Sequence, residues 1–341
     1  MRPWRTLVAV STLALAASGC SALSEDGGGD AEGGSPEVVA AFYPLEYVAA
    51  RVAGDHATVT SLTKAGVEPH DLEINVKDTA LIAQADLVVY ESEFQPAVDE
   101  TVAENAGGAT LDATDVVDLA PFEEHEEHAE DEHADEHAEE GEHADEGEHA
   151  DEGEHADEGE HADEGHEHGE FDPHFWHDPV RMASLGDAVA ASLAKLDPDH
   201  ADEYEANAAA LRTDLETLDE EFEAGLASCE RETIVVSHDA FGYLEKYGLH
   251  MAPIAGLSPD AEPTPAAIAE LQELIQREGI TTVFSETLVS PKLAETLADD
   301  LGIDSAVLDP IEGLTDETAD QDYLSLMRSN LTALRTANGC S

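Results

Sequence analysis

The chain has 341 residues, and its 79 Asp and Glu against 14 Lys and Arg give a formal net charge of −65. So acidic a chain repels nucleic-acid phosphates and anionic membrane surfaces, which excludes binding through a basic patch. The hydrophobic content of 42% is sufficient for a packed core, and the length suits two domains or one large one. Cations are the partners that this charge favours.

The N-terminus has the pattern of an export signal. Arg2 and Arg5 precede an apolar run over residues 6–17, and small residues then lead to Cys20. A basic start, a short apolar run and small residues before a cleavage point are typical of a secretory signal, and the run is too short to span a bilayer. Small residues directly before a cysteine resemble a bacterial lipobox, which predicts cleavage after residue 19 and lipidation of Cys20. A plain secretory signal with an incidental cysteine is the alternative.

Residues 20–35 are rich in Gly, Ser and acidic residues, so we expect a flexible tether. With Cys20 assigned to the lipid, Cys229 and Cys340 remain. An exported compartment permits a disulfide between them, which would pin the C-terminal helix to the end of a long helix. Two free buried thiols are the competing interpretation.

Two stretches of the chain alternate between strand and helix patterns. The first predicts strands over 37–42, 58–62 and 87–90, with helices over 44–53 and 77–85. The second predicts strands over 233–236, 251–254, 281–284 and 305–308, with helices over 264–277, 291–301 and 320–337. Such alternation is the α/β pattern, usually built on a largely parallel sheet.

A strong helical signal lies between these two stretches. Apolar residues recur at intervals of three and four, at Ala201, Tyr204, Ala208, Leu211, Leu215, Leu218, Phe222 and Leu226. One apolar stripe of this kind predicts a helix of about 29 residues and about 40 Å. The predicted architecture is therefore an N-terminal α/β lobe (36–196), one long linking helix (197–228) and a C-terminal α/β lobe (229–341).

Residues 123–170 form a separate tract with 25 acidic residues, ten His and no Lys or Arg. It holds four consecutive copies of Glu-His-Ala-Asp-Glu-Gly over 142–165 and almost no apolar side chains, so we expect a disordered loop. A solubilising insert does not need imidazoles, whereas His-rich tracts bind divalent metals. We therefore predict weak metal sites at His125, His128, His133, His137, His143, His149, His155, His161, His166 and His168. The other residues carry −40 and only five Lys, which resembles adaptation to a salty environment.

Outside the tract, three His lie where a metal ligand is expected. His70 and His174 occupy loops that neighbouring prolines stiffen, in Gly-Val-Glu-Pro-His-Asp and in Asp-Pro-His-Phe-Trp. His238 directly follows a predicted strand, where open α/β sheets bind ligands. The loop at 308–313 adds the carboxylates of Asp309 and Glu312. Three imidazoles and one carboxylate suit Zn²⁺.

Three further motifs add to these two histidine loops. They are Ser-His-Asp-Ala-Phe-Gly-Tyr (237–243), Gly-Leu-Ser-Pro-Asp-Ala-Glu-Pro (256–263) and Phe-Ser-Glu-Thr (284–287). Together the motifs support a resemblance over residues 36–340. The chain resembles the zinc-type solute-binding lipoproteins of bacterial ABC importers, the ZnuA/AdcA group of the metal-binding cluster A-I family. A His- and acid-rich loop before the second histidine is also typical of that group. The resemblance implies two α/β lobes bridged by one rigid helix, with metal in the cleft.

The resemblance also implies His70, His174 and His238 as ligands. Relatives take the fourth ligand from an acid that matches Glu312, from one that matches Asp309, or from water, and we favour Glu312. Manganese-type relatives tend to have a carboxylate where this chain has His238, which supports zinc.

The function that the resemblance implies is capture of Zn²⁺ outside the cytoplasm and delivery to a membrane permease, by a monomer anchored through Cys20 to a bacterial cell membrane. A manganese-type binding protein or an adhesin of the same fold is the alternative. A zinc hydrolase is disfavoured, because the chain lacks His-Glu-x-x-His and a recognisable nucleophile elbow. We therefore expect no enzymatic activity and no nucleic-acid partner.

Several nearby residues have weaker assignments. His177 stands where the family more often has Leu, and it is either a helper near His174 or an ordinary, partly exposed histidine at a helix start. We assign the remaining histidines to surface or structure, Phe175 and Trp176 to packing around the site, and two carboxylates to orienting loops or ligands. The remaining histidines are His56, His200 and His250, and the two carboxylates are Glu262 and Glu286.

Overall fold

The computed structural model describes residues 35–122 and 171–341. The predicted signal segment, the lipidation site Cys20, the tether up to residue 34 and the tract at 123–170 lie outside these ranges. Within them, no helix combines the length and the apolar character that crossing a membrane requires.

The first lobe is built on a four-stranded parallel sheet. Its strands are β1 (Glu37–Ala40), β2 (Thr58–Ser61), β3 (Leu87–Tyr90) and β4 (Ala109–Asp112), in the order β2-β1-β3-β4. The central strands β1 and β3 are short runs of buried Val, Leu and Ala, as expected for a parallel sheet covered on both faces. We did not predict β4, because Ala-Thr-Leu-Asp offers only one large apolar side chain.

The second lobe repeats this strand order. Its strands are β5 (Thr233–Val236), β6 (His250–Pro253), β7 (Thr282–Ser285) and β8 (Asp304–Val307), all parallel in the order β6-β5-β7-β8. In both sheets the chain passes to one side of the first strand and then to the other. Open α/β sheets bind ligands at such a switch point, beyond the carboxyl ends of the strands.

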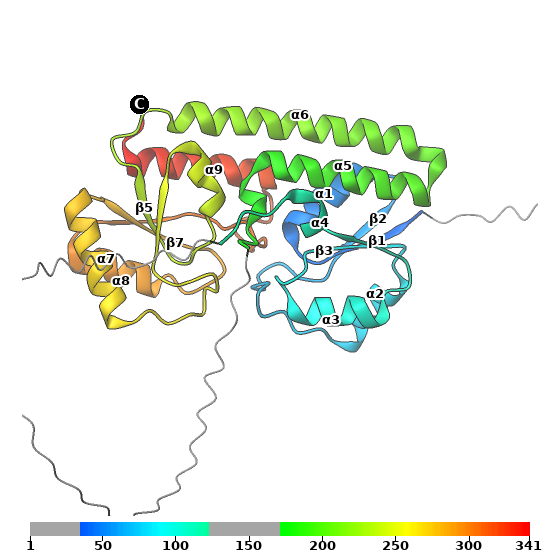
Figure 1. Ribbon diagram of the computed structural model, residues 1–341, viewed down its shortest axis with the longest axis horizontal. Helices are drawn as coiled ribbons and strands as arrows, with labels where there is room; N and C mark the ends of the chain where they lie inside the picture. The colour runs from blue at the N-terminus through cyan, green and yellow to red at the C-terminus, as the bar shows by residue number, and fades with distance from the viewer. Residues whose placement is uncertain (1–34, 123–170) are drawn as a thin grey trace, which may run out of the picture. The chain divides into compact units, whose positions relative to one another are not determined.

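Helices cover both faces of each sheet (Figure 1). In the first lobe these are α1 (Tyr43–Ala53), α2 (Val76–Gln84), α3 (Pro96–Asn105) and the short α4 (Thr114–Val117). In the second lobe α7 (Pro265–Glu278) and α8 (Lys292–Leu301) pack with the sheet around a separate apolar core that includes Val235, Leu271, Ile275 and Leu297. The segment after β5 forms a 3₁₀ helix, η3 (Gly242–Tyr247).

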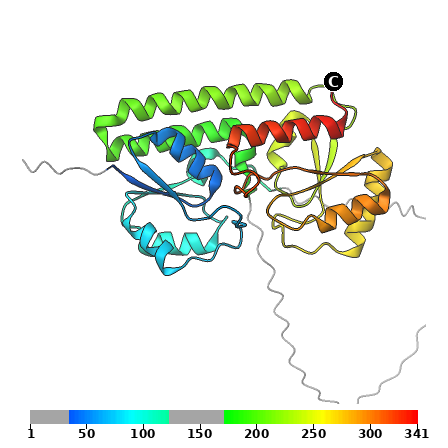
Figure 2. The same cartoon turned by 180° about the vertical axis from the view of Figure 1, so that it is seen from behind.

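Three long helices form a layer over the lobes, and one of them runs along both lobes (Figure 1). They are α5 (Pro179–Leu196), α6 (Ala201–Leu226) and α9 (Tyr323–Asn338), and α6 contacts both α5 and α9. Figures 1 and 2 show α6 running along both lobes, with α5 beneath it on the first lobe and α9 beneath it on the second. The predicted stripe from Tyr204 to Leu226 is buried, and only Ala201 is partly exposed. The prediction of two α/β lobes with one long helix between them is confirmed.

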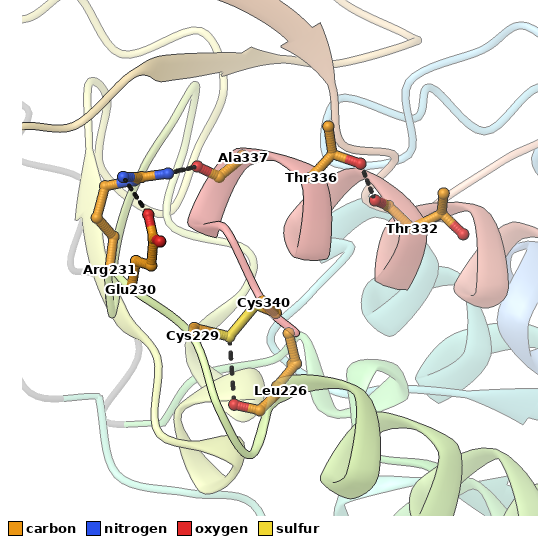
Figure 3. The surroundings of a disulfide bond; sticks show 8 residues. All are labelled: Leu226, Cys229, Glu230, Arg231, Thr332, Thr336, Ala337 and Cys340. Atoms are coloured by element: carbon orange, nitrogen blue, oxygen red, sulfur yellow. Dashed lines mark hydrogen bonds and ion pairs between the residues drawn. A yellow bond between two sulfur atoms is a disulfide. The ribbon is translucent and has the colours of Figure 1, made fainter.

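Cys229 and Cys340 form the predicted disulfide (Figure 3). It joins the segment after α6 to the end of α9. The guanidinium of Arg231 reinforces this junction by donating to the carbonyl of Ala337 at 3.0 and 3.2 Å. A cation that caps the last carbonyls of a helix also opposes the helix dipole, so both interactions stabilise the same helix end.

Candidate metal centre

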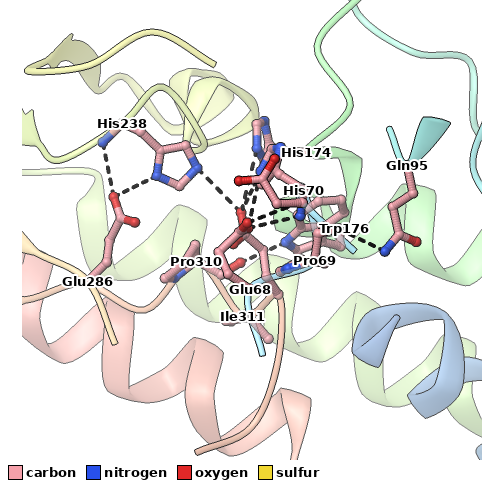
Figure 4. Close-up of polar contacts among 12 residues, drawn as sticks. Glu68, Pro69, His70, Gln95, His174, Trp176, His238, Glu286, Pro310 and Ile311 are labelled. Carbon is pink, nitrogen blue, oxygen red and sulfur yellow. Dashed lines mark hydrogen bonds and ion pairs between the residues drawn. The ribbon is translucent and has the colours of Figure 1, made fainter. Parts of the chain in front are cut away.

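Four side chains from both lobes converge on one point. His70, His174, His238 and Glu312 each offer one ligand atom, and these atoms lie within 4.8 Å of one another. One carboxylate oxygen of Glu312, Oε1, lies 3.4, 3.7 and 3.3 Å from the Nε2 atoms of the three histidines in that order. Figure 4 shows His70, His174 and His238, with the dashed contacts that converge between them. The structure thus brings together all three predicted histidines and the favoured carboxylate.

The three distances from Oε1 of Glu312 are close to the ligand–ligand distances of a tetrahedral zinc site. Zinc bonds of about 2.0–2.1 Å to nitrogen and oxygen place the ligand atoms about 3.3–3.4 Å apart along the edges of a tetrahedron. The Nε2 atoms of the three histidines and Oε1 of Glu312 are buried and have no hydrogen-bond partner in the described part of the chain. Because unpartnered buried polar atoms are costly, their convergence indicates a place for a cation.

His174 is held by a carboxylate two residues before it. Oδ1 of Asp172 lies 2.8 Å from Nδ1 of His174 and also accepts the backbone N–H of His174 at 2.9 Å. A hydrogen bond at Nδ1 fixes the tautomer in which Nε2 is free to bind metal. Gly242 allows this arrangement, since a Cβ there would lie 2.7 Å from the second oxygen of Asp172.

His238 has the same support from a different strand. It follows β5, and Glu286 follows the neighbouring strand β7, so the two side chains meet at the carboxyl edge of the second sheet. Oε1 of Glu286 accepts the backbone N–H of His238 at 3.0 Å and lies 2.7 Å from its Nδ1 (Figure 4). The predicted orienting role of Glu286 corresponds to these contacts, whereas Glu262 is exposed and has no hydrogen bond or ion pair within the described ranges.

His70 is supported differently. Glu68 accepts its backbone N–H at 3.0 Å, but the same oxygen is 4.0 Å from Nε2 of the ring. The ring lies edge-on to Phe94, with 4.6 Å between centroids. His70 is therefore fixed through its backbone and by an aromatic neighbour.

Glu312 reaches the site from a strained turn. Ile311 just before it is buried and has a φ of 60°, which is unfavourable for a β-branched residue. Two contacts hold this turn: Asp309 accepts the N–H of Ile311 at 2.8 Å, and Trp176 donates to the carbonyl of Pro310 at 2.7 Å. Asp309 lies outside the ligand group, and its contacts give it a structural part in the turn that presents Glu312.

The electrostatics of the site follow from burial and from the pairing of histidines with carboxylates. Burial opposes the charged form of His238, but Glu286 and Glu312 outweigh it and raise the pKa of His238 to about 10. Burial favours protonation of Glu312, but His238 and His70 outweigh it and hold its pKa well below the usual range. Burial lowers the pKa of His174, and Asp172 offsets part of this effect.

The His174 segment is anchored to the second lobe. The Tyr243 hydroxyl donates to the carbonyl of Asp172 at 2.7 Å, and the Tyr323 hydroxyl donates to the carbonyl of Trp176 at 2.5 Å. Trp176 is buried with its ring 5.2 Å from that of His174, and Phe175 is also buried. Trp176 therefore packs beside the site, as predicted, and Phe175 is buried with its ring 5.9 Å from that of Trp176.

His177 corrects one expectation. It is completely buried in the 3₁₀ turn η1 (Phe175–His177) and is not a partly exposed residue at a helix start. The turn directs its ring inward, 4.8 Å from that of Phe241, and burial lowers its pKa to about 3. His177 is not among the four clustered ligands.

The other three histidines lie outside the cluster. His56 and His200 stack on each other with 4.0 Å between ring centroids, and His250 is exposed. They are structural or surface residues, as expected. The predicted tract histidines lie outside the described residues.

Several residues that support the clustered histidines were not predicted from the sequence. Asp172 stands two positions before His174, and this Asp-x-His spacing was the available signal for its role. Gln95 and Tyr243 contact the ligand loops from residues distant in the chain, and no local pattern indicates those contacts.

Two parallel α/β lobes that share a long helix and bring together a group able to hold a metal ion define a solute-binding protein of the metal-binding class. The chain belongs to the family described as "ZnuA: Zinc-uptake complex component A periplasmic", which matches residues 38–337.

Two curated relatives show the extent of the similarity. The zinc-binding lipoprotein AdcA of Streptococcus pneumoniae strain R6 is 36% identical over 309 residues, which cover 89% of this chain and 56% of AdcA. The high-affinity zinc uptake system protein ZnuA of Bacillus subtilis is 32% identical over 343 residues, covering 98% of this chain and 97% of that protein. The chain thus spans about half the length of AdcA and nearly all of the Bacillus relative.

A solved structure supports the same assignment. The Zn(II)-bound ZnuA-like domain of Streptococcus pneumoniae AdcA is similar with a TM-score of 0.67 and 33% identity, covering 89% of this chain and 99% of that one.

Proposed function

We propose that this protein is the extracytoplasmic zinc-binding component of an ABC importer, which captures Zn²⁺ and delivers it to a membrane permease. The observation that supports this most directly is the set of four buried ligand atoms, with Oε1 of Glu312 lying 3.3–3.7 Å from three Nε2 atoms. His70, His174, His238 and Glu312 are the proposed ligands. The names of the relatives, zinc-binding and zinc uptake proteins, agree with this function.

The donor set favours zinc over manganese. Imidazole suits Zn²⁺, whereas Mn²⁺ prefers carboxylates, carbonyls and water. Three of the four proposed ligands are imidazoles, and two of these have a carboxylate at Nδ1 that raises their basicity toward metal. We therefore propose Zn²⁺ as the transported ion.

Transport fits the site better than catalysis does. A catalytic zinc keeps one coordination position open for water or substrate, whereas four protein ligands close a tetrahedral site. His174, His238 and Glu312 are each at most 1% exposed, and His70 is the least buried of the four. We propose that the protein performs no chemistry on its ion.

The proposed location rests on the N-terminal segment. The export pattern over residues 1–19 and the lipobox-like residues before Cys20 support a lipid anchor on the outer side of a bacterial cell membrane, and the Cys229–Cys340 disulfide fits an exported compartment. The partners are then Zn²⁺ and the permease, with the protein acting as a monomer. The tract at 123–170 would add weaker zinc sites.

A zinc titration in competition with a chromophoric chelator tests this function. The metal-free wild type should show one tight site, and the triple variant His70→Ala/His174→Ala/His238→Ala should lose it while any weak sites remain. A variant that lacks 123–170 should keep the tight site. A wild type without tight binding, or a triple variant with an unchanged tight site, would contradict the proposal, and tighter binding of Mn²⁺ would favour the manganese alternative.

A further inference from the structure

The three histidines of the metal centre differ in how their rings are oriented. His174 and His238 each have a carboxylate at Nδ1, and the same oxygen accepts the backbone N–H of that histidine. Beside His70 on the same loop, the carboxylate of Glu68 accepts the backbone N–H at 3.0 Å but lies 4.0 Å from ring atom Nε2, beyond hydrogen-bond distance. The position of His70 therefore depends on the Phe94 ring and on contacts of its backbone.

The backbone contacts centre on the peptide group between Pro69 and His70. Its N–H is held by Glu68 at 3.0 Å, and its carbonyl accepts a hydrogen bond at 2.9 Å from Nε2 of Gln95 (Figure 4). Because the peptide group is planar and includes the Cα of His70, contacts at both of its polar atoms fix its orientation and the position of the Cα that carries the His70 side chain. The amide of Gln95 thus acts on His70 through the preceding residue.

Gln95 is well placed to act as a rigid support. It lies at the residue before α3 and is 2% exposed. Its amide nitrogen also donates to the hydroxyl of Thr63 at 3.2 Å, and Thr63 in turn donates to the carbonyl of Ala41 at 2.8 Å, just beyond β1. The support therefore extends from the centre of the first sheet to the loop of His70.

We propose that Gln95 is a positioning residue for metal binding, which orients His70 through the Pro69 carbonyl in place of the carboxylate that the other two histidines have. This inference rests on the proposed function. Loss of a group that orients a metal ligand typically weakens metal binding about 10–100-fold. Gln95→Met keeps the approximate size of the side chain and removes both donors, so it should raise the zinc dissociation constant about tenfold.

The test is a double-mutant cycle read by chelator competition with Zn²⁺ on the full mature chain. In the wild-type background, Gln95→Met should raise the dissociation constant about tenfold, and in the His70→Ala background it should change it less than about twofold, because its effect passes through His70. The visible absorption of the Co²⁺-loaded protein should change in the first background only. Gln84→Met, on the exposed end of α2, is the matched control and should have no effect.

If Gln95→Met does not fold, Gln95→Asn is the second variant. It keeps the amide but withdraws it from Pro69, and it should weaken zinc binding in the same direction. An unchanged dissociation constant, or the same fold-change in both backgrounds, would overturn the inference. If the wild type itself lacked a tight zinc site, the proposed function would fail instead, so the two failures are distinct.

Discussion

Glu286 holds His238 through a single carboxylate oxygen, which accepts the backbone N–H at 3.0 Å and lies 2.7 Å from Nδ1. The two residues follow neighbouring strands of the second sheet, so the parallel order of the strands places them together. The contact leaves Nε2 of His238 for the metal and fixes the direction of its lone pair. A rigid sheet edge thus determines the geometry of one ligand.

Substitution of Glu286 should weaken zinc binding without removing a ligand. Glu286→Gln keeps the size of the side chain but loses the charge that makes His238 a stronger donor, so we expect about a tenfold rise in the zinc dissociation constant. Competition with a chelator measures this dissociation constant. Glu262→Gln changes an exposed carboxylate of the same lobe and is the control; equal effects of the two variants would count against an orienting role.

The fourth ligand can be decided by two matched variants. Glu312→Gln should raise the zinc dissociation constant by at least about 100-fold, which is more than the loss of a residue that only orients a ligand would cause. Asp309→Asn keeps an oxygen that can accept the N–H of Ile311, so zinc affinity should change less than about threefold. The opposite ranking in a competition titration would assign the metal to Asp309.

Zinc binding should release a proton from His238. Its pKa of about 10 means that the metal-free site is protonated at neutral pH, because Glu286 and Glu312 outweigh burial. Zinc must displace this proton, so affinity should rise about tenfold per pH unit near neutrality. Calorimetry in two buffers of different ionisation enthalpy should detect about one proton released per zinc ion. Identical heats of binding in the two buffers would refute this proton release.

The raised pKa of His238 also affects the stability of the metal-free chain. A raised histidine pKa contributes stability that is fully present below the unfolded value of about 6.5 and is lost as pH rises through the folded value. The contribution from His238 should therefore decline between about pH 6.5 and pH 10. A His238→Gln variant should lack this part of the pH dependence in urea unfolding.

The disulfide should stabilise the fold without affecting the metal. Cys229 and Cys340 are 111 residues apart, and closing so long a loop restricts the unfolded chain strongly. The double variant Cys229→Ser/Cys340→Ser should lose about 2–5 kcal/mol of unfolding free energy. Urea unfolding measures this loss, and reductant should reproduce it in the wild type only. Unaltered stability would contradict this expectation.

Added salt should stabilise the protein. The net charge of −65 includes −40 outside residues 123–170, and like charges on one chain repel one another unless they are screened. Thermal unfolding in low salt and in molar KCl should show a higher midpoint in molar KCl. A midpoint that is constant or falls would remove the support for adaptation to a salty environment.

The sequence predicted those parts of the fold that depend on local patterns. The apolar stripe of α6 and the buried central strands follow from the pattern of apolar residues, and motifs on proline-stiffened loops or at a strand end picked out the three histidines that cluster in the structure. Strand β4 escaped prediction because edge strands need few apolar residues. The burial of His177 depends on Phe241, which is distant in the chain, and local composition at a helix start does not reveal such a contact.

The supporting contacts were the least predictable part of the site. Gln95 reaches Pro69 only because the strand order of the first sheet brings two loops together, and Tyr243 reaches Asp172 only because the lobes meet there. Each contact is a single hydrogen bond between residues 26 and 71 positions apart. No residue pattern along the chain encodes such a pair.

An anomalous difference map at the zinc absorption edge, from crystals of the protein loaded with one equivalent of Zn²⁺, tests the central claim most directly. The result we predict is one strong peak about 2.0–2.2 Å from Nε2 of His70, His174 and His238 and from a carboxylate oxygen of Glu312. A peak elsewhere, or a zinc ion that lacks two or more of these ligands, would contradict the account.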